Sequence, residues 1–290
     1  MNKKIKNSII IIIILSLIFI IFKNNTIYIS SFYSALKLFV YKVFPFLFIM
    51  MILSSLLIKC NLPYYLNRLK INKVFYIFIM SILSGSPINA ILLIDYLKNN
   101  LINSHEASII LSFTTFNNPL FLYNYLLGIT GNIKSVIKIM SIIYILNLIL
   151  YIFFIKHTQN DKVIIKYKNY KFKNELFDII NNSLINLLKI MGIIIFFKVI
   201  TDVLFTSKQN ILTVLLKGII EITQGLNDLT NLNVNIKIKE IISFIIITFS
   251  GLSIHMQTSL VLEKYQINYK YFYLSRIFLI IIGVIIILLL

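Results

Sequence analysis

Four polar stretches interrupt otherwise apolar segments of this chain, and they contain the side chains best suited to bind a small molecule. They lie at 84–90, 112–119, 218–225 and 250–257. Their glycines and prolines predict broken helices, since proline cannot donate a backbone hydrogen bond and glycine leaves the backbone free. Broken backbone inside a bilayer is tolerated only where protein buries it or where it lines a wet cavity. Each break is therefore a candidate binding site.

A helix that begins in the middle of a membrane offers partial positive charge and free N–H groups, which together make an anion site. Pro87, the pair Asn118–Pro119 and residues 251–253 each precede a new apolar run, so three helix ends can converge on a carboxylate or phosphate. Amide and hydroxyl side chains beside these ends would orient the ligand. The alternative is that they only satisfy the broken backbone and one another. The predicted substrate-binding residues are Gly85, Ser86, Pro87, Asn89, Thr115, Asn117, Asn118, Glu221, Thr223, Gln224, Ser253 and Gln257.

Glu221 and His255 are the ionisable residues nearest the breaks. An ionisable side chain within a membrane is a functional hypothesis by default. Glu221 can accept a proton or bind a sodium ion, and histidine titrates near neutral pH, so both residues are predicted to take part in ion coupling. The structural alternative pairs them with each other, or pairs Glu221 with Lys217 one turn earlier. Apart from such a coupling proton or sodium ion, no cofactor and no metal site are predicted.

Composition and motif content narrow the class of protein. The chain has 290 residues, of which 59% are hydrophobic and 13% charged, and its mean hydropathy is +0.89, as expected of an integral protein of the lipid bilayer. Its net charge of +18 comes from lysines that mostly flank apolar segments. That pattern orients membrane helices, so nucleic acid is not an expected partner. Cys60 stands alone, which excludes an internal disulfide. No zinc-binding His-Glu motif, phosphate-binding glycine loop or nucleophile elbow occurs, so we do not expect an enzyme.

The apolar segments divide the chain into an N-terminal helix and two halves. A signal peptide is the alternative reading of the N-terminus, but Lys23 follows the apolar run where a small-residue cleavage site would stand. The first half starts with a predicted span over 32–58 that contains Pro45. The predicted parts are a retained transmembrane helix with its flanks at 1–31, a first repeat at 32–155, a basic cytoplasmic linker at 156–173 and a second repeat at 174–290.

The count of membrane crossings identifies the first break as a hairpin. Basic loops at 59–73 and 156–173 should both be cytoplasmic, so an even number of crossings must separate them, yet three apolar segments lie between. A re-entrant hairpin resolves this, because each arm has about ten residues and, at about 1.5 Å per residue, reaches only the middle of the bilayer. We therefore predict hairpin tips at 84–90 and 218–225 and broken helices at 112–119 and 250–257.

The predicted fold is an all-α polytopic membrane protein made of two inverted repeats, each with a re-entrant helical hairpin and a discontinuous transmembrane helix. Corresponding glycine and proline interruptions in two halves point to the central site of a transporter. The chain ends in a plain span, and Arg276 at its start is assigned to the flank of a cytoplasmic loop.

Five motifs, in order along the chain, resemble the YlbJ family of sporulation integral membrane proteins. Residues 84–90, Ser-Gly-Ser-Pro-Ile-Asn-Ala, resemble that family's Ser-Gly-Tyr-Pro-Val-Gly-Ala, with departures at Ser86 and Asn89. The run Gly-Ile-Ile-Glu-Ile-Thr-Gln-Gly resembles its Gly-Leu-Leu-Glu-x-Thr-x-Gly, and Ser-Gly-Leu-Ser-Ile-His-Met-Gln resembles its Gly-Gly-Leu-Ser-x-x-x-Gln. The stretches at 111–121 and 43–48 are similar to two further motifs of the family.

The resemblance implies a fold and a role. The family is part of a nucleoside-recognition "Gate" group, similar in architecture to concentrative nucleoside transporters with their two hairpins and two discontinuous helices. It implies a multi-pass protein of a bacterial cell membrane, here the mother-cell-derived outer forespore membrane. There the protein would move a small anion, dipicolinate, out of the mother cell during endospore formation. The alternatives are a nucleoside-type transporter and a non-transporting membrane assembly factor needed for sporulation. The resemblance is also compatible with a homo-oligomer.

Overall fold

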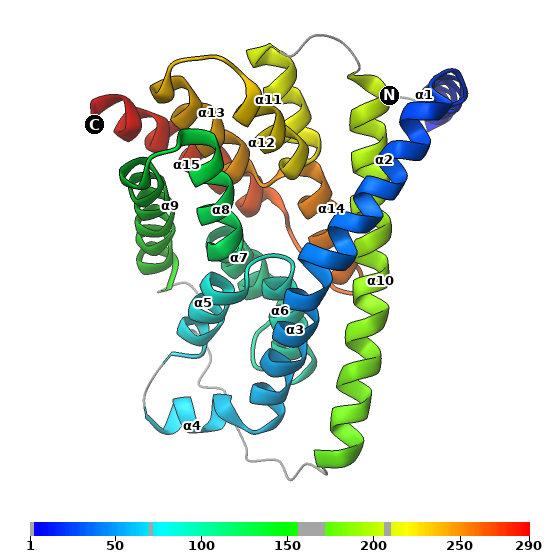
Figure 1. Cartoon of the computed structure of the whole chain (residues 1–290). Coiled ribbons are helices and arrows are strands. Elements are labelled where there is room, and N and C mark those ends of the chain that lie inside the picture. The colour runs from blue at the N-terminus through cyan, green and yellow to red at the C-terminus, as the bar shows by residue number, and fades with distance from the viewer. Residues whose placement is uncertain (1–2, 70–71, 156–171, 206–209) are drawn as a thin grey trace.

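The computed structural model describes residues 3–69, 72–155, 172–205 and 210–290, which form helices and no strands (Figure 1). Only the last two residues of the predicted linker, 156–173, lie within the described residues. Four helices are long and apolar enough to cross a membrane, and a bent pair near the N-terminus would add a fifth crossing if it is one span. The all-helical, multi-pass part of the predicted fold is confirmed. The four helices cover Ile133–Phe154, Glu175–Leu204, Ile236–Val261 and Lys270–Leu289.

The N-terminal helices are less regular than the sequence predicts. The helices α1 (Lys3–Lys23) and α2 (Asn25–Leu38) meet at Asn24, and their apolar parts are bent relative to each other by 96°. The predicted span over 32–58 is divided between the end of α2, a five-residue π-helix η1 (Phe39–Val43) and α3 (Phe44–Lys59). Pro45 lies in the first turn of α3 and has no N–H to donate to the preceding turn, which fits the wider π turn there.

The first half contains both predicted breaks. Residues 85–87 separate α5 from α6, and residues 115–118 separate α7 from α8. Proline lies at the start of the second helix in each pair, where its missing N–H removes no helical hydrogen bond. The short α4 precedes these pairs, and α9 follows them. The helices are α4 (Leu62–Arg68), α5 (Lys73–Ser84), α6 (Ile88–Lys98), α7 (Ser104–Thr114), α8 (Pro119–Thr130) and α9 (Ile133–Phe154).

The second half repeats this order of elements. A single residue, Glu221, separates α11 from α12, and Ser250 separates α13 from α14. The four breaks between these paired helices fall within the four stretches where the sequence predicts breaks. That the hairpins re-enter the membrane, and that the two halves are inverted, remain predictions. The helices are α10 (Phe172–Leu204), α11 (Ile211–Ile220), α12 (Ile222–Asn231), α13 (Ile236–Phe249), α14 (Gly251–Val261) and α15 (Lys270–Leu289).

The broken helices lie between α10 on one side of the molecule and α9 and α15 on the other (Figure 1). The long helix α10 packs against α2, α3 and α14, while α15 packs against α7, α9 and α13. Large apolar side chains on the outer helices are exposed, for example Ile137, Ile152 and Ile277. A soluble protein rarely exposes so large an apolar surface, so these faces are suited to contact lipid.

Candidate functional site

A cavity of about 550 Å³ lies where the four breaks meet. It is large enough for a small organic ligand. Its walls come from the ends of the half-helices, from the segment that joins α2 to α3, and from α10. The residues that line it are Leu38, Val43, Leu47, Ser84, Ser86, Pro87, Asn117, Asn118, Leu120, Phe121, Asn124, Tyr125, Ile194, Glu221, Ile222, Thr223, Ser253, Ile254 and Gln257.

The two breaks of the first half are in direct contact. Gly85 has a backbone φ of 76°, which residues other than glycine rarely adopt. A Cβ atom at Gly85 would lie 2.6 Å from the backbone nitrogen of Asn118, so a larger residue would push the breaks apart. The N–H of Ser86 donates to the carbonyl of Phe116 at 2.7 Å. The tip between α5 and α6 is therefore held against the break between α7 and α8.

The two breaks of the second half meet in a similar way. Gly251 has a φ of 64°, and a Cβ atom there would lie 3.1 Å from the backbone nitrogen of Ile222. Within the α11–α12 pair, a Cβ atom at Gly225 would lie 2.3 Å from the Cα atom of Gly218. The two glycines thus allow the helices to touch on either side of Glu221. This contact explains glycine at 225, whereas a Cβ atom at Gly218 would lie 2.5 Å from the side chain of Ile246 on α13.

Four half-helix N-termini adjoin the cavity, one more than the sequence predicts. Asn118 caps α8, since its Oδ1 accepts the N–H groups of Leu120 at 2.7 Å and Phe121 at 3.3 Å. Glu221 caps α12, since its carboxylate accepts the N–H of Gln224 at 2.8 Å and the Thr223 hydroxyl. The starts of α6 and α14 have no side-chain cap. No side chain competes with a ligand for the N–H groups of these two ends, although at α6 the N–H groups of Ile88 and Ala90 already donate to the carbonyls of Gly85 and Pro87.

Two serine hydroxyls at the cavity wall are free to bind a ligand. The Oγ atoms of Ser86 and Ser253 have no hydrogen-bond partner among the described residues, and both residues line the cavity. Ser253 is fully buried. A buried hydroxyl without a partner is costly, so a ligand or ordered water that bonds these groups would stabilise the site.

The structure brings eight of the predicted substrate-binding residues to the cavity and leaves four away from its wall. Gly85 makes the backbone contact described above. Asn89 donates from Nδ2 to the Thr115 hydroxyl at 3.3 Å, and both side chains are buried. Gln224 instead accepts a hydrogen bond from Lys198 at 2.7 Å. The eight at the cavity are Ser86, Pro87, Asn117, Asn118, Glu221, Thr223, Ser253 and Gln257.

Glu221 faces the cavity and does not make either of the alternative ion pairs. Its side chain is only 2% exposed, and it accepts hydrogen bonds from Thr223 and Gln224 at the start of α12. Lys217 pairs with Asp228 instead, with Nζ and Oδ2 2.6 Å apart. The carboxylate of Glu221 thus closes a helix N-terminus at the cavity wall, where it can also meet a ligand.

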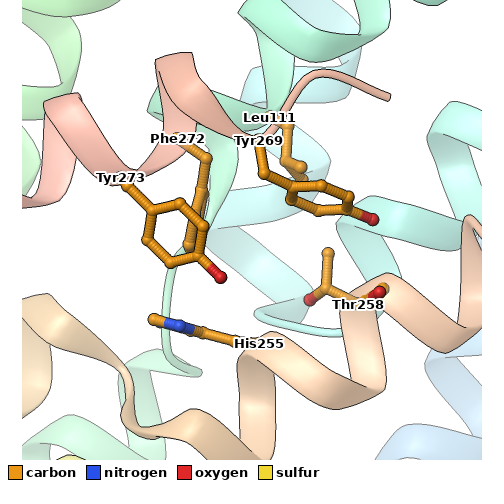
Figure 2. Close-up of a pocket in the computed structure, with 7 residues that line it drawn as sticks. Leu111, His255, Thr258, Tyr269, Phe272 and Tyr273 are labelled. Carbon is orange, nitrogen blue, oxygen red and sulfur yellow. The ribbon is translucent and has the colours of Figure 1, made fainter. Parts of the chain in front are cut away.

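His255 lies at a different, much smaller cavity. That space, of about 50 Å³, is lined by Leu111, Thr258, Tyr269, Phe272 and Tyr273 among others (Figure 2). The Nε2 atom of His255 lies 2.6 Å from the carbonyl oxygen of Phe249, which ends α13. The two predicted ion-coupling residues therefore face separate cavities, and His255 contacts the carbonyl end of the half-helix α13.

Arg276 is a central residue that sequence reasoning assigned to a cytoplasmic flank, and this assignment is wrong. Arg276 belongs to α15, and its side chain is 2% exposed and lies against the ends of α7 and α13. The only local signal is that it stands within the final apolar run. Its backbone partners come from residues far away in the sequence, which a local pattern cannot reveal.

The fold and the cavity define a class: a multi-pass integral membrane protein whose broken helices surround a partly polar cavity. The chain is similar to the sporulation integral membrane protein YlbJ of Bacillus subtilis (strain 168), with 26% identity over 287 residues, which covers 81% of this chain and 70% of the relative. This comparison confirms the resemblance to YlbJ that the motifs predict. No family model matches the chain. No solved structure matches it.

Proposed function

We propose that this chain is a transporter or facilitator that moves a small metabolite across a membrane during endospore formation. The observation that carries the proposal is the cavity of about 550 Å³ at which half-helices from both halves of the chain begin. Broken helices that meet at a central site are typical of transporters. The similarity to a sporulation integral membrane protein supports the cellular role.

The proposed substrate is dipicolinate, a planar aromatic dianion, carried out of the mother cell across the outer forespore membrane. Each helix N-terminus carries the equivalent of about half a positive charge. The two ends without a side-chain cap, at α6 and α14, would together offset roughly one of the two negative charges of a dicarboxylate. The hydroxyls of Ser86 and Ser253 and the amide of Gln257 would supply neutral hydrogen bonds at the same cavity. Apolar neighbours such as Phe121 and Ile254 would contact the ring.

A nucleoside-type substrate is the second candidate, and one observation favours it. The residues that line the cavity include the carboxylate of Glu221 and no lysine or arginine. A carboxylate repels a dianion at close range, whereas it can accept hydrogen bonds from the hydroxyl groups of a neutral sugar. The anion reading therefore requires Glu221 to be protonated or kept from the substrate's carboxylates.

Flux into proteoliposomes separates these readings. We expect the purified full-length chain to give saturable uptake of labelled dipicolinate that unlabelled dipicolinate abolishes and uridine does not. Competition by uridine alone would favour the nucleoside-type transporter. The absence of saturable flux for both would favour the third reading, a membrane assembly factor that does not transport.

A further inference from the structure

Arg276 is a buried charged side chain without a carboxylate partner among the described residues. It lies on α15 and is 2% exposed. In every ion pair among the described residues, the positively charged partner is a lysine. Burial of an unpaired guanidinium is expensive, so the residues around Arg276 must compensate its charge in another way.

Backbone carbonyls provide that compensation. The Nη2 atom donates to the carbonyl of Ser112 at 2.7 Å, and Nη1 donates to the carbonyls of Thr115 at 3.2 Å and Thr248 at 3.4 Å. The side-chain oxygen of Asn147 lies 3.5 Å from Nη2. Two of these carbonyls belong to the end of α7, and one belongs to the end of α13. Arg276 therefore joins the C-termini of two broken helices from opposite halves of the chain.

These helix ends require a positive charge. The last four carbonyls of a helix have no partner within the helix, and the end carries the equivalent of about half a negative charge. Two ends side by side carry roughly one negative charge, which a single guanidinium neutralises. The remaining carbonyls of α13 are also bonded: Ile247 accepts from Asn117 at 3.1 Å, and Phe249 contacts His255 at 2.6 Å.

Aromatic side chains hold this arrangement in place. The guanidinium carbon of Arg276 lies 5.3 Å from the centre of the Phe272 ring, within the range of a cation–π contact. The same ring meets His255 edge-on, with centroids 4.9 Å apart. Figure 2 shows His255 beside Phe272 and Tyr273. The packing thus links Arg276 and His255, and each of them bonds the end of α13.

We infer that Arg276 is a tethered cation that takes the place of a coupling metal ion at the ends of α7 and α13. In transporters with broken helices, carbonyls at half-helix C-termini are the groups that coordinate sodium. In this chain the fixed fork of a guanidinium bonds the corresponding type of carbonyl. Arg276 is thus a positioning residue, and the central helices keep their arrangement without sodium. This inference deepens the proposed function, since it concerns the coupling ion, but its first test does not depend on transport.

That test is thermal unfolding of the full-length chain in lipid nanodiscs, followed by circular dichroism, in sodium chloride and in choline chloride at equal ionic strength. We expect the wild-type midpoint to be the same in both salts. Arg276→Ala should lower the midpoint, and sodium, or guanidinium at a concentration that leaves the wild type unchanged, should restore part of the loss. The matched control is Arg68→Ala, because Arg68 is exposed at the end of α4 and should be insensitive to both cations.

Arg276→Lys keeps the charge but loses the fork, so its midpoint should lie between those of the wild type and Arg276→Ala. If Arg276→Ala does not accumulate in the membrane, the unfolding midpoints of Arg276→Lys and the wild type still test the inference. The inference is overturned if sodium raises the wild-type midpoint, or if Arg276→Lys behaves as Arg68→Ala does. In proteoliposomes, dipicolinate flux that requires sodium would also contradict it. Absence of flux would instead count against the proposed function. The unfolding midpoints would still test whether Arg276 takes the place of a sodium ion.

Discussion

At the scale of single residues, the side chains around the central cavity divide into those already bonded within the protein and those that are free. Asn118 uses its oxygen to cap α8, while Ser86 and Ser253 keep hydroxyls without partners at the cavity wall. A residue of the first kind has a structural role in addition to any contact with a ligand. Substitutions there must preserve the cap if binding is to be tested alone.

Asn118 offers such a test. Asn118→Asp and Asn118→Ser keep a good helix cap, whereas Asn118→Ala loses about 0.5–2 kcal/mol of cap stability. If the amide of Asn118 donates to an anionic substrate, Asn118→Asp removes a bond of about 1.5–3 kcal/mol and adds repulsion, so flux of dipicolinate should fall roughly tenfold or more. Asn118→Ser should lose less. Normal flux through Asn118→Asp in proteoliposomes, at equal protein content, would show that the amide does not meet the substrate.

Glu221 can be tested as the proton-coupling group. Its carboxylate lies at the cavity wall and accepts two hydrogen bonds from the start of α12. Glutamine keeps an oxygen for those bonds but cannot take up a proton. We expect wild-type flux to vary with pH and Glu221→Gln flux to vary much less, measured in liposomes with buffered interiors. An unchanged pH profile in Glu221→Gln would exclude this role.

At the scale of the elements, the pair α11–α12 depends on close contact between two glycines. The sequence marks Gly218 and Gly225 as the edges of a break, but the structure assigns the break itself to Glu221. The glycines instead lie one turn to either side, where Gly225 contacts the backbone of Gly218 and Gly218 faces the side chain of Ile246. The sequence alone cannot distinguish a glycine that breaks a helix from one that allows two helices to touch, and only the folded pair shows that these two allow contact.

Gly225→Ala should therefore destabilise the chain. Its Cβ atom would lie 2.3 Å from the Cα atom of Gly218, so the helices must separate, at a cost typical of overpacking, about 1–3 kcal/mol. Gly192→Ala is the matched control, because nothing lies within 4 Å of a Cβ atom at this position in α10, and alanine favours a helix by about 0.5–1 kcal/mol. Thermal unfolding in detergent would compare them. Equal midpoints for the two variants would contradict the close contact.

At the scale of the whole molecule, much of the architecture follows from the positions of apolar runs and of glycine and proline. These residues act locally on the backbone, so the sequence alone predicts the four breaks and the all-helical, multi-pass class. It also predicts eight of the nineteen residues that line the cavity, because polar side chains next to a break are close to it in sequence.

The remaining features depend on contacts between distant parts of the chain. Arg276 stands at the start of an apolar helix and looks like a membrane-edge residue until the carbonyls of Ser112, Thr115 and Thr248 are placed around it. Gln224 follows Glu221 closely in sequence but points to Lys198 on α10 rather than to the cavity. Periodicity and motif spacing contain no information about such tertiary partners.

The central claim is that the cavity at the four breaks binds the substrate, and protection of an introduced cysteine tests it most directly. Cys60 is exposed and is the chain's one cysteine, so Cys60→Ser provides a background without thiols. In that background Ser86→Cys faces the cavity, and Asn233→Cys, in the exposed link between α12 and α13, is the control. We expect dipicolinate to slow labelling of Ser86→Cys by a water-soluble thiol reagent and to leave labelling of Asn233→Cys unchanged. Equal labelling rates of Ser86→Cys with and without dipicolinate would contradict the claim.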